Sequence, residues 1–406
     1  ALSRAVARHA GAVGKARARG RMRPEDAQRA LDSLSVSRTL NGAAGKDLIL
    51  EAVLEDLELK ERIFADAAEH LAEDAIFATN TSSLSLQDLQ RDMKHPELLV
   101  GLHFFNPPER MPLVEVVHRE GTSKKGLARV ARLASDLGKF PVLVRDCPGF
   151  LVNRCLAPYL AQGVAMLEEG IDPERIDRIA EDFGLPMGPL RLIDEIGWDI
   201  AAKVCDVLSE AYPDRMSASE LFQVVAGEGL LGRKSGQGVY SYGKKGKTSL
   251  NKRFKTLVKT GGHLRPGSGM DDREVLDRLL LPLVAEAFRC LEDGIVASEE
   301  EIDLAMIMGT GFPPHLGGPL RWARDRGLEA IRESIEKLSG KTGLRVADSR
   351  TLTGKAGSTP ARASEAVTAD PASAAVENEE PDPENEKKDA LEVSPVAGKE
   401  PEETTG

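Results

Sequence analysis

The stretch that decides the fold reads Leu48-Ile49-Leu50-Glu51-Ala52-Val53-Leu54. Such a short apolar run is typical of a strand that is buried on both faces of a parallel sheet. Asp56 follows, and its short side chain can cap a helix. The apolar side chains of that helix recur on one face, at Leu59, Ile63, Phe64, Ala67 and Leu71.

The same alternation continues downstream of this strand and helix. Further strand-like runs occupy residues 75–79, 98–102, 113–117 and 142–144. Helical patterns lie between them, around Leu86 and Leu89 and over residues 127–137. Strands that alternate with helices predict an α/β fold with a largely parallel, layered sheet.

The strand patterns stop after Pro148. Residues 150–226 are helical in pattern, and helical patterning resumes over residues 272–338. Between them, residues 227–269 are rich in Gly, Lys and Ser, and we expect mostly loop there.

The two helical regions resemble each other in sequence. Leu167-Glu168-Glu169-Gly170-Ile171 matches Leu291-Glu292-Asp293-Gly294-Ile295 at an offset of 124 residues. Residues 153–158 match residues 277–282 at the same offset. Several matches at a nearly fixed offset predict a duplicated helical unit.

The negative charge of the chain is concentrated at its carboxyl end. The 406 residues carry a net charge of −11, and residues 350–406, with 13 acidic and 6 basic side chains, contribute most of it. No aromatic residue follows Trp322. Such a segment cannot bury enough apolar surface to offset its ordering entropy, so we expect a disordered acidic tail over residues 346–406.

Composition excludes several classes of protein. No apolar run is long enough to span a membrane, and the chain does not open with a secretory signal. The four cysteines form no CxxC pair, so we expect reduced thiols in a cytoplasmic protein. The first 30 residues carry 8 basic and 2 acidic side chains without interleaved aromatics, which favours a solvated surface helix over a nucleic-acid site.

Polar side chains follow three successive strands. The first strand run leads to Glu55, the second to Asn80-Thr81-Ser82-Ser83 and the third to His103-Phe104-Phe105-Asn106-Pro107-Pro108. Each run alone could be ordinary turn chemistry. Ligands of doubly wound sheets bind beyond the carboxyl ends of the strands, so three such runs at one edge favour a binding site.

His103 is the candidate general base, because imidazole transfers protons near neutral pH. Glu115 lies in an otherwise apolar strand, where an unpaired carboxylate would be costly. The turn between them could bring Glu115 back to His103, as a carboxylate that orients an imidazole. A partly buried structural histidine is the alternative. The other histidines show no ligand spacing, so we expect no metal site.

Residues 227–232 match the GxGxxG dinucleotide fingerprint in letters only. They follow a helical pattern rather than a strand, and no helix opens after them. We interpret this stretch as a loop, and no other part of the chain matches the fingerprint.

Seven ordered motifs carry a resemblance to a known family. They are Glu51–Glu55, Asn80–Ser83, His103–Pro107, Met111–Glu115, Pro148–Arg154, Pro186–Pro189 and Gly236–Tyr240. From about Lys46 to Leu338 the sequence resembles the L-3-hydroxyacyl-CoA dehydrogenases of fatty-acid β-oxidation. The duplicated unit is similar to the dehydrogenase part of the multifunctional β-oxidation α-subunits, which also carry an enoyl-CoA hydratase domain upstream.

The resemblance implies NAD-dependent oxidation of L-3-hydroxyacyl-CoA to 3-oxoacyl-CoA. His103 would accept the proton of the 3-hydroxyl, and Glu115 would orient His103. Ser82 and Asn153 would bind the substrate oxygen. The residues implied to contact NAD are Ala52, Glu55, Lys60, Ser82 and Asn106.

The resemblance also implies a domain organisation. Residues 1–146 would form an NAD-binding Rossmann-like domain, incomplete because its first strand and glycine-rich loop should precede residue 1. Residues 147–245 would form a first helical C-terminal domain, and residues 270–345 a second copy. Two alternatives remain: a non-catalytic module that docks on a thiolase subunit or on a second copy of this chain, and a dehydrogenase limited to 3-hydroxybutyryl-CoA.

We expect this chain to bind NAD weakly, because the glycine-rich turn and helix N-terminus that would hold the pyrophosphate lie outside it. A titration of the 406-residue chain with NADH, followed by nucleotide fluorescence, measures the affinity. Tight binding would contradict the expectation.

Overall fold

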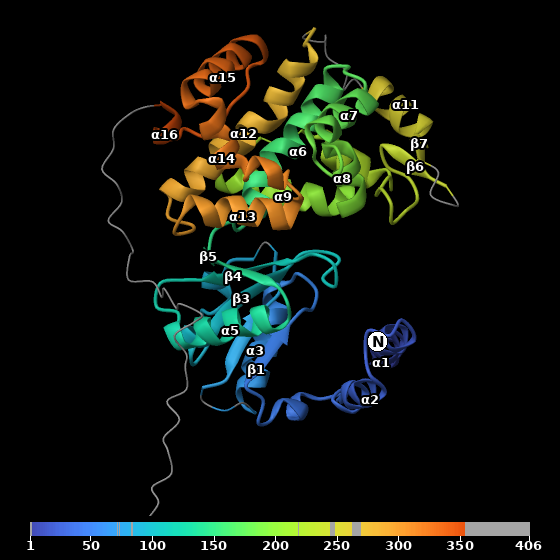
Figure 1. The fold of residues 1–406 in the computed structure, drawn as a ribbon, viewed down its shortest axis with the longest axis vertical. Helices are drawn as coiled ribbons and strands as arrows, with labels where there is room; N and C mark the ends of the chain where they lie inside the picture. The colour runs from blue at the N-terminus through green and yellow to red at the C-terminus, as the bar shows by residue number, and fades with distance from the viewer. Residues whose placement is uncertain are drawn as a thin grey trace, which may run out of the picture. The chain divides into compact units, whose positions relative to one another are not determined.

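The computed structural model describes residues 2–70, 72, 74–82, 84–217, 219–243, 248–261 and 269–353. Within these residues, a five-stranded sheet with its helices is followed by a predominantly helical region (Figure 1). The predicted fold class, a Rossmann-like α/β domain followed by a helical domain, is confirmed.

The five strands lie in the sheet in chain order. Their bounds are β1 Leu48–Glu51, β2 Ile76–Thr79, β3 Leu99–Phe104, β4 Leu113–His118 and β5 Phe140–Arg145. β3 and β4 are antiparallel, and the other neighbouring strands are parallel. The connection over residues 105–112 is too short for the crossover that a parallel pair needs. All five predicted strands are present, with ends shifted by up to three residues.

The helices of this part of the chain are short, apart from α1. They are α1 Leu2–Ala18, α2 Pro24–Asp32, the 3-10 helix η1 Leu40–Ala43, α3 Leu57–Ala68, α4 Leu86–Leu89, the 3-10 helix η2 Pro96–Leu98 and α5 Lys124–Asp136. Asp56 caps α3, as predicted, by accepting the N–H of Leu59 at 2.9 Å. Leu71, which we expected on the apolar face of this helix, lies outside the described residues.

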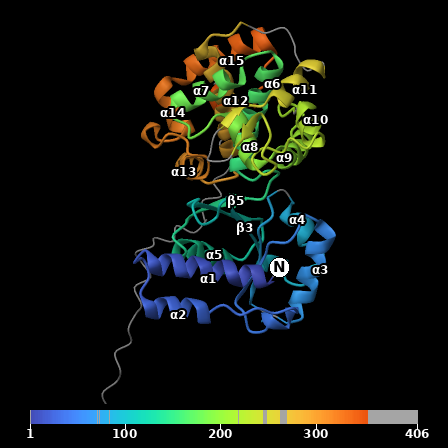
Figure 2. The same cartoon turned by 90° about the vertical axis from the view of Figure 1, so that its right-hand side faces the viewer.

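The first helix is solvent-exposed along most of its length. Val13 is its one buried residue. α1 packs side by side with α2 (Figure 2). The prediction of a surface helix at the start of the chain is confirmed.

The side chains of β4 alternate between two apolar cores. Val114 and Val116 pack with α5 against one face of the sheet. Leu113 and Val117 belong to the larger core, which continues into the helical region. Because successive side chains of a strand point to opposite faces, Glu115 shares the face of Leu113 and Val117. Its carboxylate therefore points toward the helical region.

The first helical unit begins directly after the sheet. Its helices are α6 Val152–Glu168, α7 Pro173–Phe183, α8 Pro189–Ile196, α9 Trp198–Ala211 and α10 Leu221–Gly227. The expectation that residues 227–269 are mostly loop is wrong in the middle of that range. There, β6 Tyr240–Tyr242 and β7 Thr248–Leu250 form an antiparallel hairpin, and α11 Lys252–Thr260 follows it. Strands of three residues are too short to show an alternation of apolar and polar side chains, so the sequence did not predict this hairpin.

The second helical unit follows with a similar series of helices. They are α12 Asp272–Glu292, α13 Glu299–Thr310, the 3-10 helix η4 Pro314–Leu316, α14 Pro319–Arg326, α15 Leu328–Thr342 and α16 Arg350–Thr353. The predicted start of disorder at residue 346 is wrong for residues 346–353. The Glu292 carboxylate accepts the hydroxyls of Ser349 and Thr351, and Leu352 is buried. The rest of the predicted tail lies outside the described residues.

Reciprocal ion pairs join the two units. Arg154 of α6 lies 2.6 Å from the carboxylate of Asp293, just beyond α12. Arg278 of α12 lies 2.6 Å from the carboxylate of Glu169, just beyond α6. Each residue of one pair lies 124 positions from its counterpart in the other. This reciprocity is the pattern of an isologous dimer interface, here made within one chain. Two ion pairs related by this offset are what a duplicated helical unit would produce, and the duplication itself stays a prediction.

A buried aspartate in each unit caps a later helix. These aspartates are Asp177 and Asp303, and each accepts two backbone N–H groups at the start of α8 or α14. The approach is close enough to require glycine before each capped helix. A Cβ on Gly188 would lie 2.2 Å from Cα of Asp177, and one on Gly318 would lie 2.3 Å from Cβ of Asp303.

Gly188→Ala should lower the free energy of unfolding by roughly 1–3 kcal/mol or more, because the added methyl overlaps backbone that cannot move aside. Gly340→Ala is the control, since a Cβ at this exposed position of α15 meets nothing within 4 Å. Alanine there should stabilise the helix by up to about 1 kcal/mol. Urea unfolding measures both variants. Equal midpoints would contradict the packing argument.

Candidate active site

His103 and Glu115 are directly opposed on the antiparallel strands β3 and β4. The imidazole Nδ1 donates to Oε2 of Glu115 across 2.6 Å. Glu115 is completely buried, and 6% of His103 is exposed. Opposed residues of an antiparallel pair hold their side chains about 5 Å apart, so the register of the two strands makes the contact. The structure thus brings together the residues that we predicted as base and orienting carboxylate.

The other oxygen of Glu115 binds the start of α6. Oε1 accepts the backbone N–H of Leu151 at 3.1 Å and that of Val152 at 2.9 Å. A helix N-terminus favours a negative charge, because its first N–H groups point outward and the helix dipole is positive there. A buried carboxylate that would otherwise be costly is thereby satisfied by three donors.

These contacts assign the tautomer of His103. An ionised carboxylate can only accept hydrogen bonds, so the imidazole proton lies on Nδ1 and Nε2 keeps a lone pair. The rings of Phe105 and Phe150 lie against the imidazole, with centroids 4.7 and 5.5 Å away. Phe150 has a backbone φ of +52°, a value that residues other than glycine rarely adopt. Among the described residues it is the one non-glycine residue with positive φ. The arrangement leaves Nε2 as the nitrogen that can accept a proton.

Hydrogen bonds join the ends of the three parallel strands. Glu55, after β1, accepts the hydroxyl of Thr81 and the N–H of Ser82. Asn80, after β2, accepts the N–H of Phe104 at 3.0 Å. Sequence reasoning grouped Asn80 and Thr81 as polar turn residues and assigned them no role. Their contacts depend on which strands are neighbours, which the local sequence does not reveal.

Lys60 is 1% exposed. Its Nζ lies 2.7 and 2.8 Å from the two oxygens of Glu51 and 3.3 Å from the carboxylate of Glu55. Lys60 therefore supports the strand end that carries Glu55. The contact with NAD that the resemblance implies for it stays a prediction.

The remaining predicted residues lie at or near the strand ends. Ala52 and Asn106 are exposed, following β1 and β3, and Ser82 is half-buried after β2. Asn153 is half-buried in the first turn of α6, next to the N–H groups that bind Glu115. The structure thus gathers Asn153 with His103 and Glu115, and Ser82 with Glu55.

The GxGxxG match has a structural role. It begins at the last residue of α10 rather than after a strand. A Cβ on Gly232 would lie 2.1 Å from the carbonyl oxygen of Asp194, so this glycine serves close backbone packing. The interpretation that it is not a dinucleotide fingerprint is confirmed.

No helix among the described residues is long and apolar enough to cross a membrane. In the same residues, no cluster of His, Cys, Asp and Glu side chains is arranged to hold a metal ion. The cysteines, at Cys147, Cys155, Cys205 and Cys290, are free thiols.

Residues 1–147 match the family described as "3-hydroxyacyl-CoA dehydrogenase, NAD binding domain". Residues 149–242 and 275–359 match "3-hydroxyacyl-CoA dehydrogenase, C-terminal domain". A fatty acid oxidation complex subunit alpha from Idiomarina loihiensis is 41% identical over 327 residues, or 80% of this chain. The chain belongs to the 3-hydroxyacyl-CoA dehydrogenase family. The family and its cofactor, NAD, are as predicted, and the chain spans about half the length of the curated relatives it matches.

Two solved structures of dehydrogenases are similar in fold. A 3-hydroxybutyryl-CoA dehydrogenase from Escherichia coli K12 superimposes with a TM-score of 0.74 at 27% identity, covering 87% of this chain and 90% of the other. The dehydrogenase part of multifunctional enzyme 1 from C. elegans gives a TM-score of 0.58 at 29% identity, covering 84% and 79%.

Glu115→Gln should reverse the tautomer of His103. The amide oxygen can still accept the N–H groups of Leu151 and Val152, which turns the amide NH₂ toward Nδ1 and makes Nδ1 the acceptor. Nitrogen-15 NMR of the imidazole at neutral pH reports which nitrogen carries the proton. Glu97→Gln, beside the exposed His95, is the matched control and should leave the His103 signals unchanged. An unaltered tautomer in Glu115→Gln would refute the assignment.

Proposed function

We propose that this chain oxidises L-3-hydroxyacyl-CoA to 3-oxoacyl-CoA with NAD, with His103 as the general base and Glu115 orienting it. The observation that carries the proposal is the buried His103–Glu115 pair, bound to the N-terminus of α6. A base held by a buried carboxylate suits the removal of a proton from a hydroxyl group. Both residues lie in motifs by which the chain resembles this family.

The proton balance of the reaction explains the pairing. Bound NAD would supply the acceptor for the hydride that leaves C3 of the substrate. The hydroxyl proton passes to Nε2 of His103, and the C3–O bond becomes a carbonyl. The imidazole becomes a cation, which the Glu115 carboxylate at 2.6 Å stabilises. The three donors on that carboxylate keep it in place while the charge develops.

The substrate oxygen needs partners other than the base. We assign these to the hydroxyl of Ser82 and the amide of Asn153. Ser82 is held through its N–H by Glu55, 3.1 Å away. Asn153 is held by the first turn of α6, whose N–H groups bind Glu115. Both side chains are half-buried, so each is positioned but accessible.

The described residues fit one side of an NAD site. Doubly wound sheets bind dinucleotides beyond the carboxyl ends of their strands. At this edge Glu55 binds the Thr81–Ser82 segment, and Ala52 and Asn106 are exposed beside it. We propose that these residues, with Lys60 supporting Glu55, hold NAD next to His103.

Chain length and partners are further parts of the proposal. The similarity to a 3-hydroxybutyryl-CoA dehydrogenase of Escherichia coli favours assays with short acyl chains beside long ones. The relatives named subunit alpha of a fatty acid oxidation complex support an assembly, for which we propose a thiolase subunit as the partner in the cytoplasm. A purely non-catalytic module is disfavoured, because nothing in such a role requires the buried His103–Glu115 pair.

His103→Gln should lower kcat about 10²- to 10⁴-fold, the range that a general base contributes. The measurement is NADH formation from L-3-hydroxyacyl-CoA substrates of several chain lengths by the full-length protein. His95→Gln is the matched control at an exposed histidine and should keep the parent activity. Retained activity in His103→Gln would overturn the assignment of the base, and an inactive parent would overturn the proposed function.

A further inference from the structure

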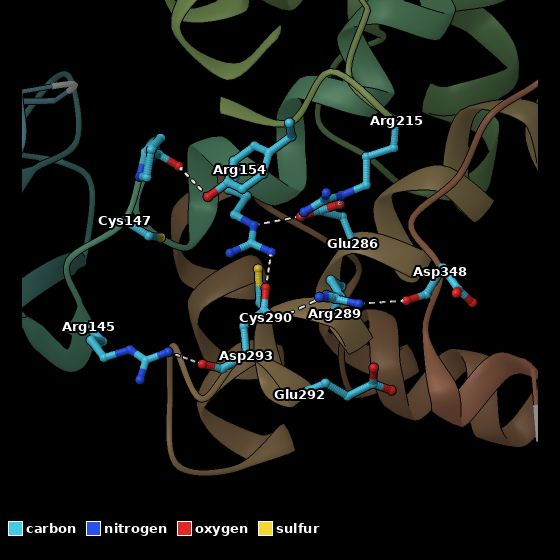
Figure 3. A network of polar contacts seen from close by, with 12 residues as sticks. Arg145, Cys147, Arg154, Arg215, Glu286, Arg289, Cys290, Glu292, Asp293 and Asp348 are labelled. Carbon is cyan, nitrogen blue, oxygen red and sulfur yellow. Dashed lines mark hydrogen bonds and ion pairs between the residues drawn. The ribbon is translucent and has the colours of Figure 1, made fainter. Parts of the chain in front are cut away.

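Hydrogen bonds from a turn of the second helical unit hold the linker between the sheet and the helices, residues 146–151. Arg145, at the end of β5, donates through its guanidinium to the carbonyl of Asp293 (Figure 3). Its backbone N–H donates to the carbonyl of Ile295 at 2.8 Å. Residues 146–151 then lead into α6. One end of this linker is thereby tied to the turn at Asp293–Ile295.

Arg154 ties the other end of the linker to the same turn. It is 1% exposed. Its Nε donates to Glu286 of α12 and its Nη2 to Asp293, both at 2.6 Å (Figure 3). A buried guanidinium with two carboxylate partners is held strongly, because both charge-assisted hydrogen bonds compensate its charge in a poorly solvated site.

An aromatic ring completes the anchor. Tyr212 packs against two guanidinium groups, with its ring centroid 4.6 Å from Cζ of Arg154 and 4.4 Å from Cζ of Arg215. Its hydroxyl reaches the carbonyl of Pro148 in the linker at 3.5 Å. Arg215 also binds Glu286 at 2.9 Å, so the same carboxylate is shared by both arginines.

The fastened linker carries much of the candidate site. Leu151 and Val152 supply the N–H groups that bind Glu115. Phe150 packs on the imidazole of His103. Asn153 immediately precedes Arg154. A shift of this segment would therefore move the carboxylate, the base and a substrate-binding residue together.

We propose that the second helical unit positions the reacting side of the first, with Asp293 and Glu286 acting through Arg154 to set the linker against His103 and Glu115. This inference rests on the proposed function for its catalytic consequence. Arg154, Asp293 and Glu286 are positioning residues, since each acts through the linker.

The duplication provides an internal control. Arg278 and Glu169 form the reciprocal ion pair. Nη1 and Nη2 of Arg278 each lie 2.6 Å from one oxygen of the Glu169 carboxylate. Like Arg154 and Asp293, these two residues form a partly buried arginine–carboxylate pair. The residue before Arg278 is Asp277, whose carboxylate binds Arg326 rather than serving a site. A variant in this pair disturbs the same interface without touching the linker.

The experiment compares Asp293→Asn with Glu169→Gln in the full-length protein. In Asp293→Asn, Arg154 keeps the Glu286 carboxylate, whereas in Glu169→Gln the buried Arg278 loses the carboxylate that binds it bidentately. Glu169→Gln should therefore cause the larger fall in Tm. The loss of kcat should follow the opposite order, with the larger loss in Asp293→Asn. Asp293→Asn should lower kcat roughly ten- to hundredfold, because small misplacements of reacting groups cost that much, while Glu169→Gln should keep kcat within about twofold of the parent.

A merely structural role would make the loss of activity follow the loss of stability. If Glu169→Gln lost at least as much kcat as Asp293→Asn, the inference would be overturned. Arg154→Lys adds a conservative variant: it retains the charge but not the fork that reaches both carboxylates. It should show the kcat loss of Asp293→Asn, and unchanged turnover would count against the inference.

Nitrogen-15 NMR of His103 gives a readout that needs no turnover. Asp293→Asn and Arg154→Lys should shift the imidazole signals of His103, and Glu169→Gln should not. Shifts in this pattern with an inactive parent would support the positioning and refute the proposed function. Unshifted signals in Asp293→Asn with an active parent would refute the positioning alone.

Discussion

The carboxylate of Glu115 is the constraint on which the rest of the structure depends. One oxygen accepts from the imidazole of His103 and the other from two backbone N–H groups at the start of α6. A fully buried carboxylate tolerates few alternatives, because each lost donor leaves a charge without compensation in a poorly solvated interior. The same contacts therefore fix the orientation of the imidazole that we propose as the base, the tautomer of its ring and the direction in which the chain enters α6.

The duplicated helical unit supports that arrangement in the way a second subunit would. α6 and α12 carry reciprocal arginine–carboxylate pairs, yet only α6 begins next to Glu115. The two units thus have a similar architecture but different contacts with the candidate site. The first carries Asn153, which we propose as a substrate-binding residue, and the second supplies the two carboxylates that bind Arg154. Because both units belong to one chain, every first unit has a second unit beside it, and the second cannot dissociate as a separate subunit could.

Much of the site could be predicted because it rests on local periodicity. His103 and Glu115 stand out as polar residues in apolar strands, and a two-residue strand period with a short turn places them on one face. Leu48–Leu54 and the later apolar runs predicted every strand of the larger sheet, since buried strands need continuous apolar residues. The errors fall where the apolar pattern is too short to recognise, in the β6–β7 hairpin and in residues 346–353, where only Ala347 and Leu352 supply buried apolar side chains.

The sequence by itself determined the order of strands and helices in the larger sheet, the repeated motifs, the family and the residues able to do proton chemistry, because these depend on spacing along the chain. Tertiary structure alone decided that Lys60 is buried against Glu51, and that Arg154 binds Asp293, which lies 139 positions further along the chain. Ion pairs between distant segments leave no local signal. Their partners are chosen by the packing of whole elements, and a buried charge takes whichever opposite charge that packing brings within reach.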